Sequence, residues 1–525
     1  MPSAPLVDAL DTNGDGVIDA AEIEAAGASL LTLDRDKDGR LSRDEFGLVM
    51  PMGGPGGFPG GFPGGPGGMG QDREVVKDYD TDGDGRLNDE ERATARAALE
   101  SAAAEGGRRG GFMPFGPGGP GRPGGGAVEV AERARVKPED VEAFGDRELY
   151  DPTIVRTLFL TFPNDDWELE LETFYRTDVE VPATLTVDGK SYPDVGVHFR
   201  GNTSYMMAQR GTKRPLNISI DDVHKEQNLL GYRTLNLLNA AGDPSLMREY
   251  LYYEFSRRFV PALKVNHVRL VINGEDWGVY VNSQQFNKDS VEEMFGERNG
   301  ARWKVPANLS GSSSLLYTSD QVEDYRDKYL LKSKEDPRAW NDLIALCRAL
   351  QETPIERQEE ELGRMLDLDE ILKFLALENV MMDEDGYVTR GSDFYIYQEA
   401  RNGRFHLIAH DNNETFKQGG MMGPGGFGER GRGRRGFGGG GGGGGAMPAV
   451  ESTALPVPGV DDETIVYNGW DPLRGADNPQ RPLLNRLLAN PTLKARYLEH
   501  RQAILDEIGS GPGGPGRKPN APGGH

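Results

Sequence analysis

The sequence predicts an α+β protein in two parts, an all-helical N-terminal module and a larger domain with two lobes. Three acidic repeats of twelve residues lie within residues 1–104. After them, short runs of β-branched and aromatic residues bounded by Gly or Asn, such as Val195–Phe199 and Val268–Ile272, are typical of strands. The later part carries longer apolar segments with helical spacing, such as Trp340–Glu352. A strand-rich half followed by a helical half favours a two-lobed architecture.

Size, charge and cysteine content exclude several classes of protein. The 525 residues are too many for one compact core, so more than one domain is expected. The formal net charge of -25 leaves no basic surplus for phosphate backbones, which argues against a nucleic-acid-binding protein. The single cysteine, Cys347, excludes an intramolecular disulfide, and its apolar surroundings favour a buried structural thiol. No apolar run approaches the ~20 residues of a membrane span.

Each acidic repeat has the pattern of a complete EF-hand calcium loop. Such a loop supplies about seven oxygens, from side chains at positions 1, 3, 5, 9 and 12 and from the backbone carbonyl at position 7, while Gly at position 6 permits the sharp turn. The predicted ligands are Asp11, Asn13, Asp15, Val17, Asp19 and Glu22 in the first loop, Asp34, Asp36, Asp38, Arg40, Ser42 and Glu45 in the second, and Asp80, Asp82, Asp84, Arg86, Asn88 and Glu91 in the third. A dockerin-like repeat uses the same loop, but the long spacing to the third copy counts against it.

Segments rich in Gly and Pro divide the chain, because such a composition cannot bury enough apolar surface to fold. We expect an EF-hand module at 1–104 with an internal linker at 51–70, a linker at 105–127, a large domain at 128–508 with a Gly-rich insertion at 419–445, and a disordered tail at 509–525. The linker at 105–127 predicts that the calcium module is only loosely attached to the large domain.

An acidic stretch from Asn379 to Phe416 is the most prominent feature of the large domain. Its middle predicts a hairpin, with strands around Phe394 and at Phe405–Ala409 and a turn at Asn402-Gly403. A hairpin brings the acidic residues at its base together, and carboxylates at strand ends commonly hold Mg²⁺ against a phosphate. A surface hairpin with solvated charges is the open alternative.

Four ordered segments of the large domain resemble the CotH family, the spore-coat-protein-H-type kinases. They are VGVHFRGNTS, LLGYRTLNLLNAAGDPSLMREYLYYEF, VRLVINGEDWGVY and the hairpin DEDGY…DFYIY…HDNNETF, which together cover roughly residues 158–416. The resemblance implies a protein-kinase-like fold and transfer of the ATP γ-phosphate, with Mg²⁺ or Mn²⁺, to Ser residues of secreted or coat proteins.

The resemblance also implies roles for individual residues. Asp385 resembles the catalytic Asp that orients the attacking hydroxyl and accepts its proton, and Asp411 resembles a catalytic Asp that binds metal. Lys213 or Arg214 would then neutralise the nucleotide phosphates, with Glu249 as the ion-pair partner. Lys304 is a further candidate for nucleotide contact.

Some positions depart from the family pattern. His410 replaces the Trp before the metal-binding Asp, Asn413 followed by Glu414 stands where a second Asp is expected, and Asp393 replaces an Asn. The metal ligands implied for this domain are therefore Asp393, Asp411, Asn413 and Glu414. These changes leave two possibilities open, a metal-dependent enzyme with shifted ligands and an inactive pseudokinase.

We therefore expect an extracytoplasmic kinase, secreted or in the cell envelope, that acts on Ser or Thr of a protein and binds Ca²⁺ through its EF-hands. Its expected partners are ATP and the protein substrate, with no nucleic acid and no membrane span. Met1-Pro2-Ser3 does not begin a signal peptide, so we expect the leader to be absent from this chain. The alternatives are a calcium-dependent scaffold with an inactive kinase-like domain and, more weakly indicated, a secreted enzyme acting on carbohydrate.

Overall fold

The computed structural model describes residues 73–108, 132–307, 313–416 and 469–509, together with the isolated positions 25, 26, 29 and 32. The chain divides into two compact units, Met1–Gly68 and Met69–His525. The second unit is described below. The first two calcium loops (11–22 and 34–45), the linker at 51–70 and the insertion at 419–445 lie outside the described residues.

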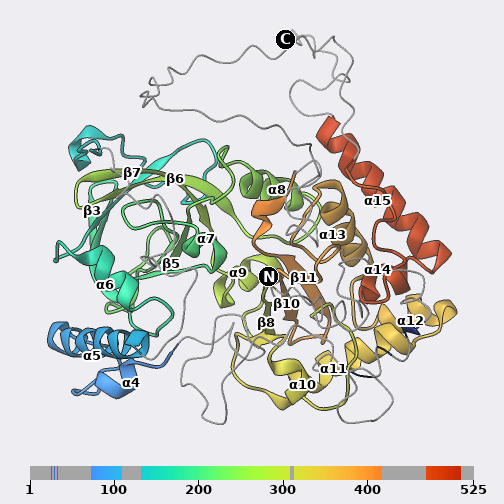
Figure 1. Cartoon of the computed structure of the whole chain (residues 1–525). Helices are drawn as coiled ribbons and strands as arrows, with labels where there is room; N and C mark the ends of the chain where they lie inside the picture. The colour runs from blue at the N-terminus through green and yellow to red at the C-terminus, as the bar shows by residue number, and fades with distance from the viewer. Residues whose placement is uncertain are drawn as a thin grey trace, which may run out of the picture. The chain divides into compact units, whose positions relative to one another are not determined.

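Seven strands close into a barrel in the first half of the second unit (Figure 1). The order around the barrel is β1-β2-β3-β4-β5-β7-β6. Most neighbours are antiparallel, but β1 and β6 pair in parallel, from Arg156↔Val268 to Leu160↔Ile272, and this pairing closes the barrel. The strands are β1 (Arg156–Thr161), β2 (Val181–Val187), β3 (Lys190–Phe199), β4 (Leu216–Ser219), β5 (Thr234–Leu238), β6 (Val265–Ile272) and β7 (Glu275–Ser283).

Alternating side chains fill the barrel. Along β2 every second residue is buried, beginning with Val181 and ending with Val187, which is the period of a strand with one face in a core. These residues join inward-facing side chains of the other strands, such as Leu158, Leu235 and Leu270, in one apolar cluster. Two short helices lie on the barrel connections, α6 (Trp167–Thr173) and α7 (Thr203–Met206).

A second sheet of four strands lies in the later half, in the order β11-β10-β8-β9. Its strands are β8 (Ala301–Val305), β9 (Leu330–Leu331), β10 (Phe394–Gln398) and β11 (Phe405–Ala409). Every residue of β10 and β11 is buried, as expected of strands covered on both faces. Figure 1 shows α13, α14 and α15 gathered beside this sheet. The helices of this half are α8 (Arg248–Ser256), α9 (Lys288–Phe295), α10 (Glu323–Arg326), α11 (Pro337–Glu352), α12 (Gln358–Leu362), α13 (Leu368–Val380), α14 (Pro482–Leu487) and α15 (Pro491–Gly509), with the 3₁₀ turns η2 (Pro138–Asp140), η3 (Ile355–Arg357) and η4 (Asn412–Glu414).

The predicted fold class, a two-lobed protein-kinase-like α+β domain preceded by an all-α EF-hand module, is wrong. The strand-rich half is a closed seven-stranded barrel, and the half expected to be mostly helical is built around a four-stranded sheet. The third calcium loop belongs to the same compact unit as the barrel. The parallel pairing of β1 with β6 closes the barrel and so accounts for the main difference from the predicted lobe. It joins strands that are far apart in the chain, and such a pairing leaves no local pattern in the sequence.

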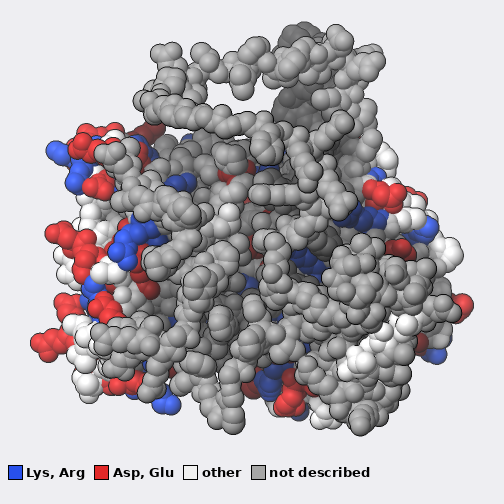
Figure 2. Space-filling model, viewed as in Figure 1, with Lys and Arg blue, Asp and Glu red and all other residues white. Residues whose placement is uncertain are grey.

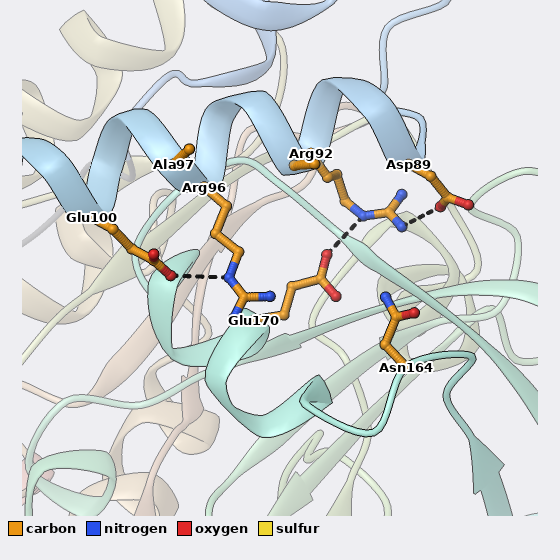
Figure 3. A pocket seen from close by; sticks show the side chains of 8 residues that line it. Asp89, Arg92, Arg96, Ala97, Glu100, Asn164 and Glu170 are labelled. Carbon is orange, nitrogen blue, oxygen red and sulfur yellow. Dashed lines mark hydrogen bonds and ion pairs between the residues drawn. The ribbon is translucent and has the colours of Figure 1, made fainter.

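The third calcium loop is docked on the barrel and not loosely tethered to it. The loop is flanked by α4 (Val76–Tyr79) and α5 (Asp89–Arg108), and α5 extends into the predicted linker. Figure 3 shows α5 lying against α6 across a pocket of ≈ 320 Å³, with Arg92 reaching the carboxylate of Glu170. This ion pair measures 3.0 Å and both side chains are almost fully buried.

The surface of the described residues carries mixed charge. In Figure 2, basic and acidic side chains are interspersed along the left edge of the view, over the barrel and α5. Cys347 lies in the apolar core of the later half, as its sequence context predicts. Within the described residues, none of the helices combines the length and apolar character that crossing a membrane requires.

A buried histidine ties the β10–β11 hairpin to α13. The ring nitrogens of His406 lie 2.8 Å from Glu370 on α13 and 2.8 Å from Glu399 beyond β10. Burial alone lowers the pKa of His406, but the hydrogen bonds and charges of Glu370 and Glu399 outweigh it and raise the pKa. The protonated ring can donate to both carboxylates at once.

We predict that His406→Gln destabilises the protein at about pH 6, by about 2 kcal/mol, and much less at about pH 9. Because the pKa of His406 is raised in the folded state, its contribution is complete below the unfolded pKa and is lost as the pH rises through the folded pKa. Urea unfolding at both pH values measures the difference. His500→Gln, at a more exposed pair with Asp369, is the control and should change stability little. An equal loss for His406→Gln at both pH values would contradict the prediction.

Candidate functional site

The base of the β10–β11 hairpin carries two aspartates. Asp393 precedes β10 and Asp411 follows β11, and the strands between them pair from Phe394↔Ala409 to Gln398↔Phe405. The turn contains Gly403 at φ 74°, so the hairpin predicted from Asn402-Gly403 is present. Asp393 and Asp411 themselves have φ values of 55° and 60°. Such left-handed backbone is strained for residues other than Gly and concentrates at functional positions.

The turn after α13 brings two more carboxylates to this place. The amide of Asp383 donates to the Glu378 carbonyl at 3.1 Å, and the Asp383 carboxylate accepts from the amide of Asp385 at 3.2 Å. The side-chain amide of Asn412, in η4, donates to the other oxygen of Asp383. The turn is therefore joined to the residues that follow β11.

A fifth carboxylate comes from α8, which packs against η4. The hydroxyl of Tyr253 donates to the Ala409 carbonyl at 3.0 Å and ties the helix to β11. Glu249, one turn earlier, is 5% exposed, and its Oε2 has no hydrogen-bond partner among the described residues. A buried carboxylate oxygen without a partner is unfavourable, so this oxygen is available to a ligand or cation.

Burial of these acids, followed by the charges of their acidic neighbours, raises their pKa values. Burial first, and then the charge of Glu414, raise the pKa of Asp385 to about 7, although the paired charge of Arg390 opposes the rise. Burial likewise raises the pKa of Asp383 to about 6. The pKa values of Glu249 and Asp393 lie well above the ordinary value. Burial is the larger cause of the rise, and the negative charge of Asp411 is the second.

Two basic residues face the acids from different parts of the fold. Lys304 lies on β8, in register with Tyr395 of β10, and Arg200 directly follows β3 of the barrel. Burial first, and then the charge of Arg200, lower the pKa of Lys304 to about 8, while Asp411 and Asp393 oppose the decrease. Asp411 is exposed, and partial desolvation by the surrounding protein raises its pKa against the charges of Lys304 and Arg200.

A cavity of ≈ 470 Å³ opens beside these two bases. Its aromatic wall includes Phe286 and Tyr395, whose rings stack at 4.3 Å. The basic residues that line it are Arg200, Arg233, Lys288, Arg302, Lys304 and Lys332, and its acidic ones are Asp221 and Asp289. Among the described residues, no ion pair engages the cations of Arg200, Lys304 or Lys332. The cavity is therefore suited to a ligand with several negative charges and a planar group.

The two candidate metal sites of the described residues differ in kind. Carboxylate oxygens of Asp80, Asp82 and Asp84 in the third loop lie within 4.8 Å of one another, which fits a loop that surrounds Ca²⁺ with its own oxygens. The amides of Gly83 and Gly85 hold Asp80 at 2.7 and 2.9 Å. The acids at the hairpin do not converge as closely.

The remaining predicted ligands surround Asp411 and the third loop. Asn413 donates its side-chain amide to Asp411 at 2.6 Å, so it orients this carboxylate. Glu414 lies close enough to raise the pKa values of Asp385 and Asp411. In the third loop, Glu91 accepts from the amides of Thr81 and Asn88 at 2.7 and 2.9 Å.

Lys213 and Arg214 are not part of this site. Lys213 donates to the Val279 carbonyl and lies over the ring of Tyr280. Arg214 is buried and forms an ion pair of 2.5 Å with Glu172 of α6. The expected pairing of either base with Glu249 is therefore replaced by other contacts. Arg200 is the cation whose charge acts on Glu249.

Three residues of the site were missed in the sequence. Arg200 directly follows an apolar strand, Asp383 lies two residues before Asp385, and Glu378 lies one turn earlier on α13. The acidic turn was a signal for Asp383. Nothing local distinguished Arg200 from its basic neighbours, because its role depends on the contact between the barrel and the second sheet.

Comparisons with known proteins agree with the sequence motifs. The family model of the CotH kinase protein matches residues 197–508, and an EF-hand model matches residues 8–25 and 29–50. Invasin CotH3 of Rhizopus delemar is 22% identical over 291 residues, which is 53% of this chain and 47% of the relative. Spore coat protein homolog 1 of the same organism is 25% identical over 193 residues, 34% of this chain and 27% of the relative.

A bacterial relative matches over a shorter region. The inner spore coat protein H-like protein of Bacillus subtilis is 34% identical over 97 residues, 18% of this chain and 31% of the relative. The chain spans less than half the length of each of these relatives. The family model nevertheless matches more than half of the chain. The chain therefore belongs to the CotH kinase protein family and carries EF-hand motifs at its N-terminus.

Proposed function

We propose that this protein transfers the γ-phosphate of ATP to Ser or Thr of a protein, in the presence of Mg²⁺ or Mn²⁺. One observation carries the proposal. A cavity in which Arg200, Lys304 and Lys332 form no ion pair within the described residues lies beside a cluster of largely buried carboxylates, and the charges of Lys304 and Arg200 act on both. A nucleoside triphosphate with its cation has the complementary charges, with phosphates for the bases and metal for the acids.

The residues have distinct roles in this reaction. Lys304 and Arg200 bind phosphate oxygens in the cavity, and the stacked rings of Phe286 and Tyr395 offer an apolar wall to the base. Asp411 and Asp393 would hold the divalent cation, with Asn413 orienting Asp411. The bound cation supplies neutralisation of charge on the phosphates.

Asp385 is suited to act on the acceptor. The acceptor hydroxyl oxygen forms a bond to the γ-phosphorus as the bond to the β,γ-bridging oxygen breaks, and ADP leaves. The hydroxyl proton passes to the carboxylate of Asp385. A pKa of about 7 for Asp385 suits a group that must accept a proton near neutral pH.

A second candidate, an inactive scaffold that binds calcium and nucleotide, is favoured by one contact. Arg390 forms an ion pair with Asp385, and a carboxylate held in this way accepts a proton less readily. In an active kinase Arg390 must leave Asp385 before this carboxylate can accept a proton. In a scaffold the ion pair between Arg390 and Asp385 would persist.

The names of the relatives support an extracellular or envelope location and an acceptor in a coat or surface protein. One relative is named an invasin and two are named spore coat proteins.

The first experiment measures label transfer from γ-labelled ATP to the full chain itself and to a Ser-rich acceptor, with Mg²⁺ or Mn²⁺. We predict that Asp385→Asn and Asp411→Asn each lower the rate about 10²–10⁴-fold, because each removes a carboxylate that acts on the reacting groups. Asp327→Asn makes the same chemical change at an exposed residue after α10 and should leave the rate unchanged. Nucleotide binding without any transfer in the unmodified protein would favour the scaffold.

The second experiment tests the cavity by comparing two lysines. We predict that Lys304→Met weakens binding of Mg²⁺–ATP about 10-fold or more, since one charge-assisted hydrogen bond contributes about 1.5–3 kcal/mol. Lys213→Met, which keeps the apolar stem beside Tyr280, should leave the affinity unchanged. Isothermal titration calorimetry measures both. A reversed order would restore the role that the sequence assigned to Lys213.

Glu378 is proposed as a positioning residue beneath the catalytic turn. It is fully buried, accepts from the hydroxyl of Tyr252 at 3.3 Å, and lies so close to Gly386 that a Cβ there would be 2.0 Å from its Oε2. Burial and the neighbouring Asp383 raise its pKa well above the ordinary value, which favours the neutral acid. A neutral acid and an amide have nearly the same shape.

We predict that Glu378→Gln keeps the transfer rate, whereas Glu378→Ala lowers kcat and leaves the nucleotide affinity unchanged. The reason is that the amide preserves the packing under Gly386 and the alanine does not. Steady-state kinetics and nucleotide titration of both variants provide the test. Equal losses in both variants would mean that Glu378 acts through its charge.

A further inference from the structure

The third EF-hand loop uses the barrel as its packing partner. Val75 before α4, Leu87 at position 8 of the loop and Ala95 on α5 are buried in the apolar cluster that fills the barrel. The carboxylate of Asp178, from the segment before β2, accepts from the amides of Val75 and Val76 at 2.6 and 3.1 Å. Leu87, the apolar residue that an EF-hand loop would present to a neighbouring hand, thus packs against the barrel instead.

Arg86 connects the loop to one particular turn of the barrel. Its backbone carbonyl is at position 7, where an EF-hand loop ligates Ca²⁺ through the main chain. Its guanidinium donates to the carbonyl of Asp222 and lies 3.4 Å from the Asp222 carboxylate. One residue therefore offers its main chain to the cation and its side chain to the turn between β4 and β5.

Without Arg86 this turn would experience repulsion. Asp222 lies beside Glu180 of the neighbouring segment, and both approach closely because Gly196 lacks a side chain. A Cβ on Gly196 would lie 2.9 Å from the Cβ of Glu180 and 3.0 Å from the Cγ of Asp222. The guanidinium of Arg86 lies 3.4 Å from the Asp222 carboxylate and places a positive charge at this contact. Arg86 thus offsets a like-charge contact.

The same turn forms part of the cavity wall. Asp221 lines the cavity together with Arg233 and Thr234 at the start of β5, and Asp221 lies 3.9 Å from Arg233. Lys225 donates to the carbonyls of Asp221 and Asp222 at 3.1 and 2.6 Å. A shift of Asp222 therefore moves an acidic and a basic residue of the cavity together.

We propose that Ca²⁺ in the third loop, acting through Arg86, fixes the β4–β5 turn and thereby tightens binding of an anionic ligand in the cavity. With Ca²⁺ bound, the loop holds Arg86 on Asp222, and Asp221 stays with Arg233. Without Ca²⁺, repulsion among Asp80, Asp82 and Asp84 loosens the loop and frees the turn. The part of this inference that concerns nucleotide rests on the function proposed above.

The test uses the full chain and two readouts. Hydrogen exchange of residues 216–238 is measured with Ca²⁺ and with a calcium chelator, in the absence of nucleotide. Calorimetry then measures binding of a non-hydrolysable imido analogue of ATP with Mg²⁺ under the same two conditions. Arg86→Gln keeps the main-chain ligand and removes the contact with Asp222. A double variant, Asp11→Ala with Asp34→Ala, disables the first two loops and serves as the control.

We expect Ca²⁺ to protect residues 216–238 and to raise the affinity for the analogue about 5-fold or more. Both effects should persist in the double variant and disappear in Arg86→Gln. An effect of equal size in Arg86→Gln, or no calcium-dependent protection in the unmodified chain, would overturn the proposal. Protection without any binding of the analogue would instead refute the nucleotide site and leave the link between loop and turn standing.

Discussion

Desolvation of carboxylates at the base of the β10–β11 hairpin is the constraint on which the site depends. Asp393 and Asp411 flank the paired strands, and Asp383 and Asp385 reach them from the turn after α13. Burial raises the pKa values of these acids first, because a charged carboxylate loses its hydration, and the neighbouring negative charges raise them further. The cluster is favourable only with compensating cations. Lys304 and Arg200 provide part of that compensation, and a divalent cation would provide the rest.

The compensation requires both halves of the larger unit. Lys304 is fixed by the pairing of β8 with β10, whereas Arg200 is fixed by the end of β3 in the closed barrel. Barrel closure thus does more than bury apolar side chains. It sets the direction in which the chain leaves β3 and positions the β4–β5 turn in the wall of the same cavity. The site forms where the rim of a closed barrel meets the second sheet.

The parts of this arrangement that could be predicted are those with local causes. The hairpin follows from an Asn-Gly turn between two apolar runs, and its acidic base follows from the hairpin. Barrel closure could not be predicted, because strands of an open sheet and of a barrel alternate in the same way. The same limit explains the choice among cations. Lys213 and Arg214 lie near the start of a strand, much as Arg200 lies at the end of one. However, Lys213 donates to the Val279 carbonyl and Arg214 pairs with Glu172 of α6. Both partners are remote in sequence.

The third EF-hand illustrates why a complete motif does not define a separate module. The twelve residues specify ligands for Ca²⁺, yet the apolar residues around them specify a partner, and here Leu87 and Val75 are buried with the barrel. Ordering of the third loop and its docking on the barrel are therefore coupled, so that a change which favours one favours the other. Any free energy that Ca²⁺ contributes to the ordered loop also favours the docked position of Arg86 on Asp222. By thermodynamic reciprocity, a ligand that stabilises the β4–β5 turn must then raise the affinity of the loop for Ca²⁺.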